Sequence, residues 1–165
     1  CKSKNLDTMA NGIVQFLCAK MDLKGSAIFF YNSELHELET LATFGLSSTY
    51  LTKGIITVDK SFFAANREGK LSVCTEKDIN TSLQYPEKAK KEGIASIVSV
   101  PIIYLDEFLG VFRLYHSVQC TPTEDDLVSL SILGHCIGLA MTSNRLLNAT
   151  QTISDLLNDV LPVAD

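Results

Sequence analysis

Arg113 is the charged residue whose position most clearly suggests a chemical role, because it stands in a strand-like run that is otherwise apolar from Leu109 to Tyr115. A guanidinium in such a run must reach water, a carboxylate or the anionic group of a ligand, since an unpaired buried charge is strongly unfavourable. Alternation along a strand places Arg113 on one face with Val111 and Tyr115. Two roles follow: an internal salt bridge to an acid such as Asp78, or contact with a bound anion.

The other side chains that could support catalysis or bind a metal are scattered. The histidines have no partner at metal-ligand spacing, and the adjacent His135 and Cys136 would point about 100° apart on a helix. The sequence lacks a glycine-rich phosphate loop, a Gly-x-Ser-x-Gly motif and a helical His-Glu-x-x-His motif. We therefore predict no catalytic activity and no intrinsic metal, and no pattern identifies a cofactor.

The cysteines and the composition limit the compartment and the class of protein. Five widely spaced cysteines without a Cys-x-x-Cys pair argue against a disulfide framework, so we expect a reducing, cytoplasmic environment. A length of 165 residues with 46% hydrophobic residues fits a single domain over residues 1–165. The net charge of −5, with 14 basic residues spread along the chain, argues against direct nucleic-acid binding.

The chain shows no targeting or membrane segment that would change this interpretation. No apolar run approaches the roughly 20 residues that span a bilayer, so we expect no membrane insertion. The chain begins at Cys1 without a basic-then-apolar signal segment, and we interpret it as part of a longer cytoplasmic protein.

Residue periodicity predicts the elements of the first quarter of the chain. Apolar residues at three- and four-residue spacing indicate an amphipathic helix over about residues 5–21. The β-rich residues 27–31 and the alternating residues 37–44 indicate a hairpin. In its second strand Leu38, Thr40 and Ala42 are expected on one face.

Residues 46–92 are less regular. We expect a short helix over residues 58–68, a short strand over residues 70–74 and another helix over residues 82–92. Asn66, in the first of these helices, is expected on a solvated face.

The C-terminal part reads as one long helix over about residues 122–160. Thr121 as N-cap with Pro122 and Glu124 gives one start for this helix, and Thr123 with Asp126 gives an alternative start. At about 1.5 Å of rise per residue the helix must extend past a single-domain core. An apolar stripe of nearly heptad spacing lies in its distal half. The residues of this stripe are Leu147, Ile153, Leu157 and Val160.

The stretch from Gly93 to Tyr115 reads as two apolar strands around a polar tip, Asp106-Glu107, with Pro101 at a strand end or edge and Gly110 at a turn. This layout resembles the GAF domain. In that family a Gly-Ile-x-Ser segment leads into a strand ending Val-Pro-Leu or Val-Pro-Ile, and the following strand begins Ile-Gly-Val or Leu-Gly-Val. The matching segments are Gly93-Ile94-Ala95-Ser96, Val100-Pro101-Ile102 and Leu109-Gly110-Val111.

The resemblance implies an α+β fold of GAF or PAS type. Such a fold has a central antiparallel sheet of five or six strands, with the terminal helices on one face and a helical or loop insert over the other. The more apolar Phe112 and Leu114 should then meet the terminal helices, which leaves Arg113 and Tyr115 facing the insert. A small cavity is expected between the sheet and the insert. Its expected lining residues are Phe62, Cys74, Ser96, Val98, Arg113 and Tyr115.

Three specialised GAF subclasses can be compared with this chain. Bilin-binding members carry a cysteine followed by histidine in the covering region, whereas Cys74 is followed by Thr75. Free-methionine-sulfoxide reductases need cooperating cysteines, and Cys74 has no neighbour to resolve it. The Asn-Lys-Phe-Asp-Glu signature of cyclic-nucleotide-binding members is absent. We therefore expect Cys74 to serve as a small buried apolar residue.

The resemblance implies a sensory or regulatory domain of a larger signal-transduction protein. It would bind a small ligand, anionic because of Arg113, or relay signals through a dimeric helical bundle, with a homodimer partner and the output domain of the parent protein. The alternatives are an enzyme similar to free methionine-(R)-sulfoxide reductase that uses Cys74, and a ligand-free dimerisation module.

Overall fold

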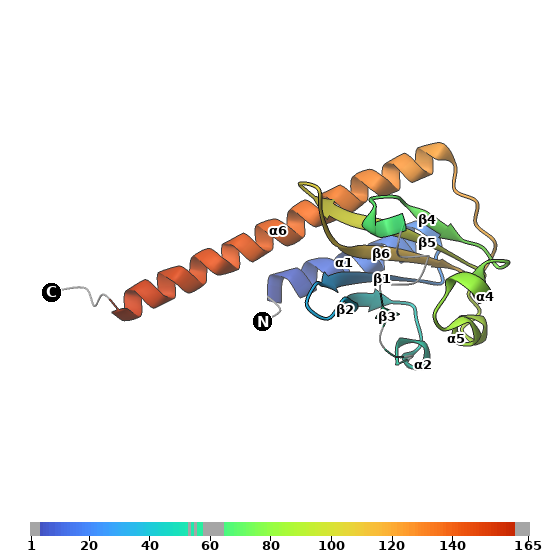
Figure 1. Ribbon diagram of the computed structural model, residues 1–165, viewed down its shortest axis with the longest axis horizontal. Helices are drawn as coiled ribbons and strands as arrows, with labels where there is room; N and C mark the ends of the chain where they lie inside the picture. Colours follow the sequence, from blue (N-terminus) through green and yellow to red (C-terminus); the bar gives the residue numbers. More distant parts are fainter. Residues whose placement is uncertain (1–3, 53, 55, 58–64, 161–165) are drawn as a thin grey trace.

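The computed structural model describes residues 4–52, 54, 56–57 and 65–160, which form an α+β fold around one antiparallel sheet (Figure 1). The strands are β1 Gly25–Asn32, β2 Glu37–Phe44, β3 Ile56–Thr57, β4 Ser72–Cys74, β5 Ser96–Tyr104 and β6 Glu107–His116. The helices are α1 Lys4–Met21, α2 Ser48–Leu51, α4 Ile79–Ser82, α5 Pro86–Lys91 and α6 Glu124–Val160. The six strands lie in the order β3-β2-β1-β6-β5-β4, and the predicted fold class is confirmed.

The β1–β2 hairpin contains a bulge that changes which side chains share a face. The register passes from Ile28 opposite Ala42 to Phe29 opposite Thr40, so Leu41 is the extra residue. An extra residue interrupts the period of two. Leu38 therefore packs on the face covered by α2, α4 and α5, whereas Leu41 and Ala42 both pack on the other face. The predicted alternation through Leu38, Thr40 and Ala42 was wrong.

The β5–β6 hairpin has the expected strands, but its glycine, Gly110, lies at a different place from the one predicted. Pro101 lies beyond the β4 pairing, which ends opposite Ser99, so it sits where β5 has a free edge among the described strands. Gly110 does not form the turn, because it lies inside β6 opposite Phe30 of β1. A Cβ at Gly110 would collide with the Phe29 carbonyl oxygen, so glycine permits the close approach of β6 to β1.

One face of the sheet is covered by α1 and α6, and this helix face is packed with apolar side chains. Two glycines bring α6 against the backbone of β5: a Cβ at Gly138 would lie 2.6 Å from the Ile103 carbonyl oxygen, and one at Gly134 would collide with that of Pro101. The buried residues of the helix face are Ala10, Val14, Leu17, Ile28, Leu41, Ala42, Val98, Val100, Ile102, Leu109, Phe112, Leu114, Leu130, Ile137 and Met141.

The opposite face, which we call the insert face, is covered by segments from residues 46–92. The helix expected over residues 82–92 is shorter, α5 Pro86–Lys91, because α4 ends at Ser82 and the chain is extended at Leu83 (ψ 144°) before α5 begins. Pro86 opens α5 because a proline at the first helical position costs no hydrogen bond. Most of the helix expected over residues 58–68 lies outside the described residues, although residues 65–67 are helical.

Of the two helix starts predicted from the sequence, the structure has the one in which Thr123 and Asp126 cap the N-terminus of α6. Asp126 Oδ2 accepts hydrogen bonds from Thr123 N and Thr123 Oγ1 at 2.9 and 2.7 Å, and Asp126 N donates back to Thr123 Oγ1 at 3.2 Å. This reciprocal pairing satisfies donors at the N-terminus of the helix. By length and composition α6 is apolar enough to cross a membrane, a property that buried core helices share, so the expected absence of a membrane span stays a prediction.

Candidate functional site

Arg113 lies on the insert face, as alternation predicts. Its side chain is buried, at 3% exposure, and its guanidinium carbon lies 5.7 Å from the centroid of the Phe29 ring on the neighbouring strand β1. A cation over an aromatic face is attracted by the ring quadrupole. The fold therefore holds a positive charge within the packed layer between the sheet and the insert.

Tyr115 and Tyr50 add two further polar side chains to the layer between the sheet and the insert that holds Arg113. Tyr115 shares the insert face of β6 with Arg113, and its ring meets that of Tyr50 from α2 edge-on, with centroids 5.8 Å apart. Burial raises the pKa of both phenols, and the Arg113 charge acts on both in the opposite direction. Both hydroxyls are thus protonated at neutral pH.

A small cavity of about 40 Å³ lies between the sheet and the insert. It has room for about three water molecules. Of the six residues predicted to line a cavity on this face, Tyr115 lines this one. The other described ones do not: Cys74, Ser96, Val98 and Arg113. The lining residues are Phe29, Leu38, Thr40, Leu46, Tyr50, Leu51, Gly54, Ile56 and Tyr115.

Cys74, at the end of β4, is fully buried in the insert-face core. Burial is the main cause that raises the pKa of its thiol to about 11, and the Asp78 carboxylate adds to the shift. The thiol is therefore protonated at neutral pH, whereas the nucleophilic form of cysteine is the thiolate. This environment is unfavourable for the sulfoxide reductase chemistry considered above.

Ser96 and Val98 do not lie on the insert face, which corrects their predicted position. Val98 belongs to the helix-face core, and Ser96 is two residues away on the same strand and therefore on the same side. Ser96 Oγ donates to the Val118 carbonyl oxygen and accepts from Cys120 N, both at 3.0 Å. Its role is to hold the connection between β6 and α6. Phe62 lies outside the described residues.

The predicted salt bridge between Arg113 and Asp78 is absent from the ion pairs among the described residues. Asp78 is exposed, and its carboxylate accepts hydrogen bonds from Thr75 N at 3.3 Å and Thr75 Oγ1 at 2.6 Å. These bonds lower the pKa of Asp78. The carboxylate closes a local turn.

Asn66 is a buried polar residue whose position the sequence did not reveal. It was expected on a solvated face, but its side chain is fully buried. Its amide nitrogen donates to the Lys70 and Ser99 carbonyl oxygens at 2.8 and 3.1 Å, and its amide oxygen accepts from Ser99 Oγ at 2.8 Å and Ser72 Oγ at 3.4 Å. Gly69, at φ +79°, turns the chain so that Lys70 can return to this amide. A polar residue three positions before a glycine is the only sequence signal of the turn, and it does not indicate burial.

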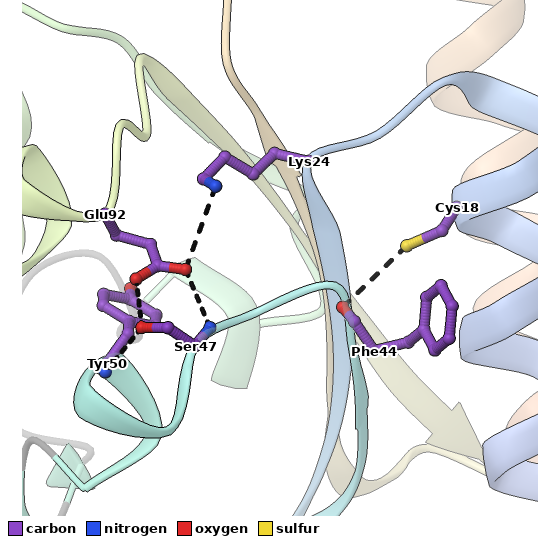
Figure 2. Close-up of polar contacts among 6 residues, drawn as sticks. All are labelled: Cys18, Lys24, Phe44, Ser47, Tyr50 and Glu92. Atoms are coloured by element: carbon purple, nitrogen blue, oxygen red, sulfur yellow. Dashed lines mark hydrogen bonds and ion pairs between the residues drawn. The ribbon is translucent and has the colours of Figure 1, made fainter.

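A polar clamp formed by Glu92, Ser47 and Lys24 holds α2 in place over the insert face (Figure 2). Ser47 N donates to Glu92 Oε1 at 2.8 Å, Ser47 Oγ donates to Glu92 Oε2, and Lys24 Nζ lies 3.9 Å from Glu92 Oε1. Ser47 Oγ also accepts from Tyr50 N at 3.2 Å as the N-cap of α2. The clamp thereby fixes the helix that carries Tyr50 against the end of α5.

No group of three or more histidine, cysteine, aspartate or glutamate side chains is placed to hold a metal ion within the described part of the chain. The expected absence of an intrinsic metal stays a prediction.

Comparison with known proteins agrees with this architecture. The family model of the GAF domain matches residues 5–141. A domain of a protein assigned as a two-component sensor histidine kinase from Sinorhizobium meliloti 1021 is similar in structure, with a TM-score of 0.75, 14% identity, and coverage of 92% of this chain and 99% of that chain. The GAF domain of a phosphoenolpyruvate-protein phosphotransferase from Coxiella burnetii has a TM-score of 0.74 at 17% identity and covers 89% and 88% of the two chains.

A third similar structure is the blue-light absorbing form of the PixJ GAF domain from Thermosynechococcus elongatus, with a TM-score of 0.70, 14% identity and 93% of each chain covered. At these identities the likeness is one of fold. The search of curated proteins finds no match.

Proposed function

Because the chain belongs to the GAF domain family, a family of sensory and regulatory modules, we propose that it senses a small anionic ligand on the insert face and passes the change to α6. The observation that carries this proposal is the burial of Arg113, at 3% exposure, on the side of the sheet that also holds Tyr50, Tyr115 and the cavity. A buried guanidinium binds carboxylates and phosphates with charge-assisted hydrogen bonds. The ligand is therefore a small carboxylate or phosphate compound.

The elements around Arg113 provide a way for a bound ligand to change the fold. Tyr50 belongs to the four-residue helix α2, which is held in place by the Glu92 clamp. Short segments with few backbone hydrogen bonds open at low free-energy cost. A ligand that enlarges the small cavity would displace α2 from the sheet.

In this proposal, helix α6 transmits the change caused by ligand binding to the rest of the protein. This helix packs on β5 with its first half and extends away from the sheet with its second half (Figure 1). We assign the second half to the output side of a homodimer, joined to the remainder of a larger cytoplasmic signalling protein.

The size of the cavity favours a second candidate function, a ligand-free dimerisation module. A volume of about 40 Å³ is much smaller than the several hundred Å³ of typical ligand pockets. In this alternative Tyr50 and Tyr115 fill the pocket permanently, and Arg113 is a structural cation. The protonated thiol of Cys74 disfavours the enzymatic alternative.

The decisive experiment compares binding by the parent chain and two arginine variants. Native mass spectrometry of protein isolated from its own host identifies a bound anion, and calorimetry with that compound measures the affinity. We expect Arg113→Ala to weaken binding by about 1.5–3 kcal/mol, which is roughly 10- to 150-fold. Arg145→Ala, which removes an exposed arginine of α6, is the matched control and should bind as the parent does.

Three results would contradict the sensing proposal. Unchanged affinity in a folded Arg113→Ala variant would remove Arg113 from the site. Unfolding of both Arg113→Ala and the charge-retaining Arg113→Lys in the absence of ligand would favour the structural role. Protein from the host that carries no small molecule and binds none of a panel of carboxylates and phosphates would favour the dimerisation module.

A further inference from the structure

The aromatic ring of Tyr50 fills part of the space between the sheet and the insert. Tyr50 is 3% exposed and is the buried residue of the four-residue helix α2. Its ring meets the Tyr115 ring edge-on, at an interplanar angle of 81°, with the centroids 5.8 Å apart. Helix α2 therefore reaches the insert-face core through this side chain.

The walls around the Tyr50 ring are suited to a flat apolar group. Tyr50 lines the cavity of about 40 Å³, so removal of its phenol group would join the volume of that group to the cavity. An enclosed space of about 150 Å³ with leucine, isoleucine and phenylalanine walls holds a benzene molecule. The walls here are of the same kind. They include Phe29, Leu38, Leu46, Ile56 and Tyr115.

The Arg113 guanidinium favours a negative charge at the hydroxyl end of the Tyr50 ring. Burial raises the pKa of the Tyr50 phenol and Tyr115 adds to the shift, whereas the Arg113 charge lowers the pKa. The Glu92 carboxylate opposes Arg113 with the smallest of these effects. Arg113 itself is buried beside Phe29, with its guanidinium carbon 5.7 Å from the ring centroid. An anionic group placed there would gain a charge-assisted hydrogen bond.

The attachment of α2 permits the Tyr50 ring to leave this space. Outside the core, α2 is held through its N-cap residue Ser47, whose N and Oγ both donate to the Glu92 carboxylate. Ser47 is exposed, so water can replace its hydrogen bonds when α2 moves. A segment anchored by one buried side chain and by exposed hydrogen bonds opens at a lower free energy than the sheet beneath it.

We propose that Tyr50 is an internal occupant of the ligand site, and that the ligand is an aromatic carboxylate of about the size of benzoate that replaces the Tyr50 ring. The ring of the ligand packs beside Phe29, and its carboxylate faces Arg113. This inference rests on the sensing proposal and narrows its ligand from any small carboxylate or phosphate to one that carries an aromatic ring.

The space left by Tyr50 disfavours the other anions that Arg113 could bind. A small aliphatic acid or a free phosphate would satisfy the guanidinium but would leave the volume of the Tyr50 ring empty. An unfilled cavity in a packed core lowers stability in proportion to its volume. A ligand with an aromatic ring restores the contacts that are lost when Tyr50 leaves.

The first experiment removes the internal occupant. Isothermal titration calorimetry measures benzoate binding to the parent chain, to Tyr50→Ala and to Thr49→Ala, whose exposed side chain is the neighbour of Tyr50 on α2. We expect Tyr50→Ala to bind benzoate at least about 10-fold more tightly than the parent chain, because the parent must first expel Tyr50. Thr49→Ala should bind benzoate as the parent does, within about 2-fold.

The same variant separates the contribution of the ring from that of the charge. Tyr50→Ala is titrated with acetate, which lacks the ring, and with benzamide, which has the shape of benzoate without its charge. Each compound should bind about 10-fold or more weakly than benzoate. Equal affinity for acetate and benzoate would exclude an aromatic subsite, and equal affinity for benzamide and benzoate would exclude recognition of the charge by Arg113.

A further variant keeps Tyr50 and covers the case in which Tyr50→Ala does not fold, as judged by circular dichroism. Glu92→Ala removes the acceptor of the Ser47 hydrogen bonds and thus favours release of α2. We expect it to bind benzoate about 3- to 10-fold more tightly than the parent chain. The control is Glu87→Ala, which removes a surface ion pair of α5 with Lys90 and should leave the affinity unchanged.

The outcomes distinguish this inference from the sensing proposal. A folded Tyr50→Ala that does not bind benzoate, or unchanged affinity in Glu92→Ala, would overturn the inference. Protein from its own host that carries an aliphatic acid or a phosphate bound through Arg113 would overturn only the inference. Benzoate binding to Tyr50→Ala but to neither the parent chain nor Glu92→Ala would overturn both, since Tyr50 would then be a permanent part of the core.

Discussion

The two faces of the sheet are built from the same strands and differ in what they bury. On the helix face, the core between the sheet and α1 and α6 is mainly apolar, and its buried polar side chains include the uncharged hydroxyls of Ser26 and Ser96. The insert face holds Arg113, Tyr50, Tyr115 and Asn66 among its apolar residues, in addition to a cavity. One strand, β6, supplies Phe112 to the first face and Arg113 to the second. Alternation along a strand is thus sufficient to separate a packing surface from a polar one.

This difference indicates where each face can tolerate change. A packed apolar face is stabilised by close fit, and its weakest points are the places where no extra atom can enter. A face with buried polar groups is stabilised by hydrogen bonds that must all be made, and its weakest points are those groups. Different substitutions are therefore needed to disrupt each face.

The largest effect is expected from Gly138→Val on the helix face. The new side chain would meet the Ile103 carbonyl oxygen, which belongs to β5 and cannot move aside, so α6 must shift outward. We expect a loss of roughly 3 kcal/mol in the free energy of unfolding, measured by urea denaturation at fixed protein concentration. Gly12→Ala in α1 is the control, because nothing lies within 4 Å of the added Cβ, and it should stabilise by about 0.5–1 kcal/mol. Destabilisation of similar size by both changes would show that close packing of α6 is not the reason.

A smaller effect is expected on the insert face from Asn66→Ala. The change leaves the buried Ser99 hydroxyl and carbonyl groups without the amide that they contact, at a cost of about 2 kcal/mol. Asn148→Ala removes an exposed amide of α6 whose partner is the Asn144 side chain, and it should change stability by less than about 0.5 kcal/mol. If urea denaturation gives equal values for the two variants, the buried network does not stabilise the insert.

The smallest effect concerns the pH dependence of the insert face. The folded chain holds the pKa of Cys74 at about 11, above the pKa of the same thiol in the unfolded chain. The stability gained from this difference in pKa is fully present below the pKa of the unfolded chain. It is lost as the pH rises from there through the pKa of the folded chain. Burial of Tyr50 and Tyr115 acts in the same direction.

We therefore expect the free energy of unfolding to fall between about pH 9 and pH 10, with a contribution of about 1 kcal/mol from Cys74. Cys74→Ala should flatten this fall. Cys136→Ala, which removes an exposed thiol of α6, should leave the slope as it is in the parent chain. Identical slopes for the parent and Cys74→Ala would contradict the assignment.

Local pattern in the sequence was enough to predict most of the elements. The helix at the N-terminus, both hairpins, the long last helix and the face occupied by Arg113 and Tyr115 all follow from periods of 3.6 and 2.0 and from glycine and proline positions. These features depend on residues that are close together in the chain. The family resemblance came from the same short range, within one hairpin.

The positions that local pattern did not predict depend on contacts between distant residues. The bulge at Leu41 shifted one strand by a residue, and Val98 proved to face the helices because register across β5 and β6 sets its side. Asn66 is buried because Ser99, 33 residues away, supplies its partners. Period and propensity describe a single segment, whereas burial, register and the pKa of Cys74 arise only when segments far apart in the chain exclude water from one another.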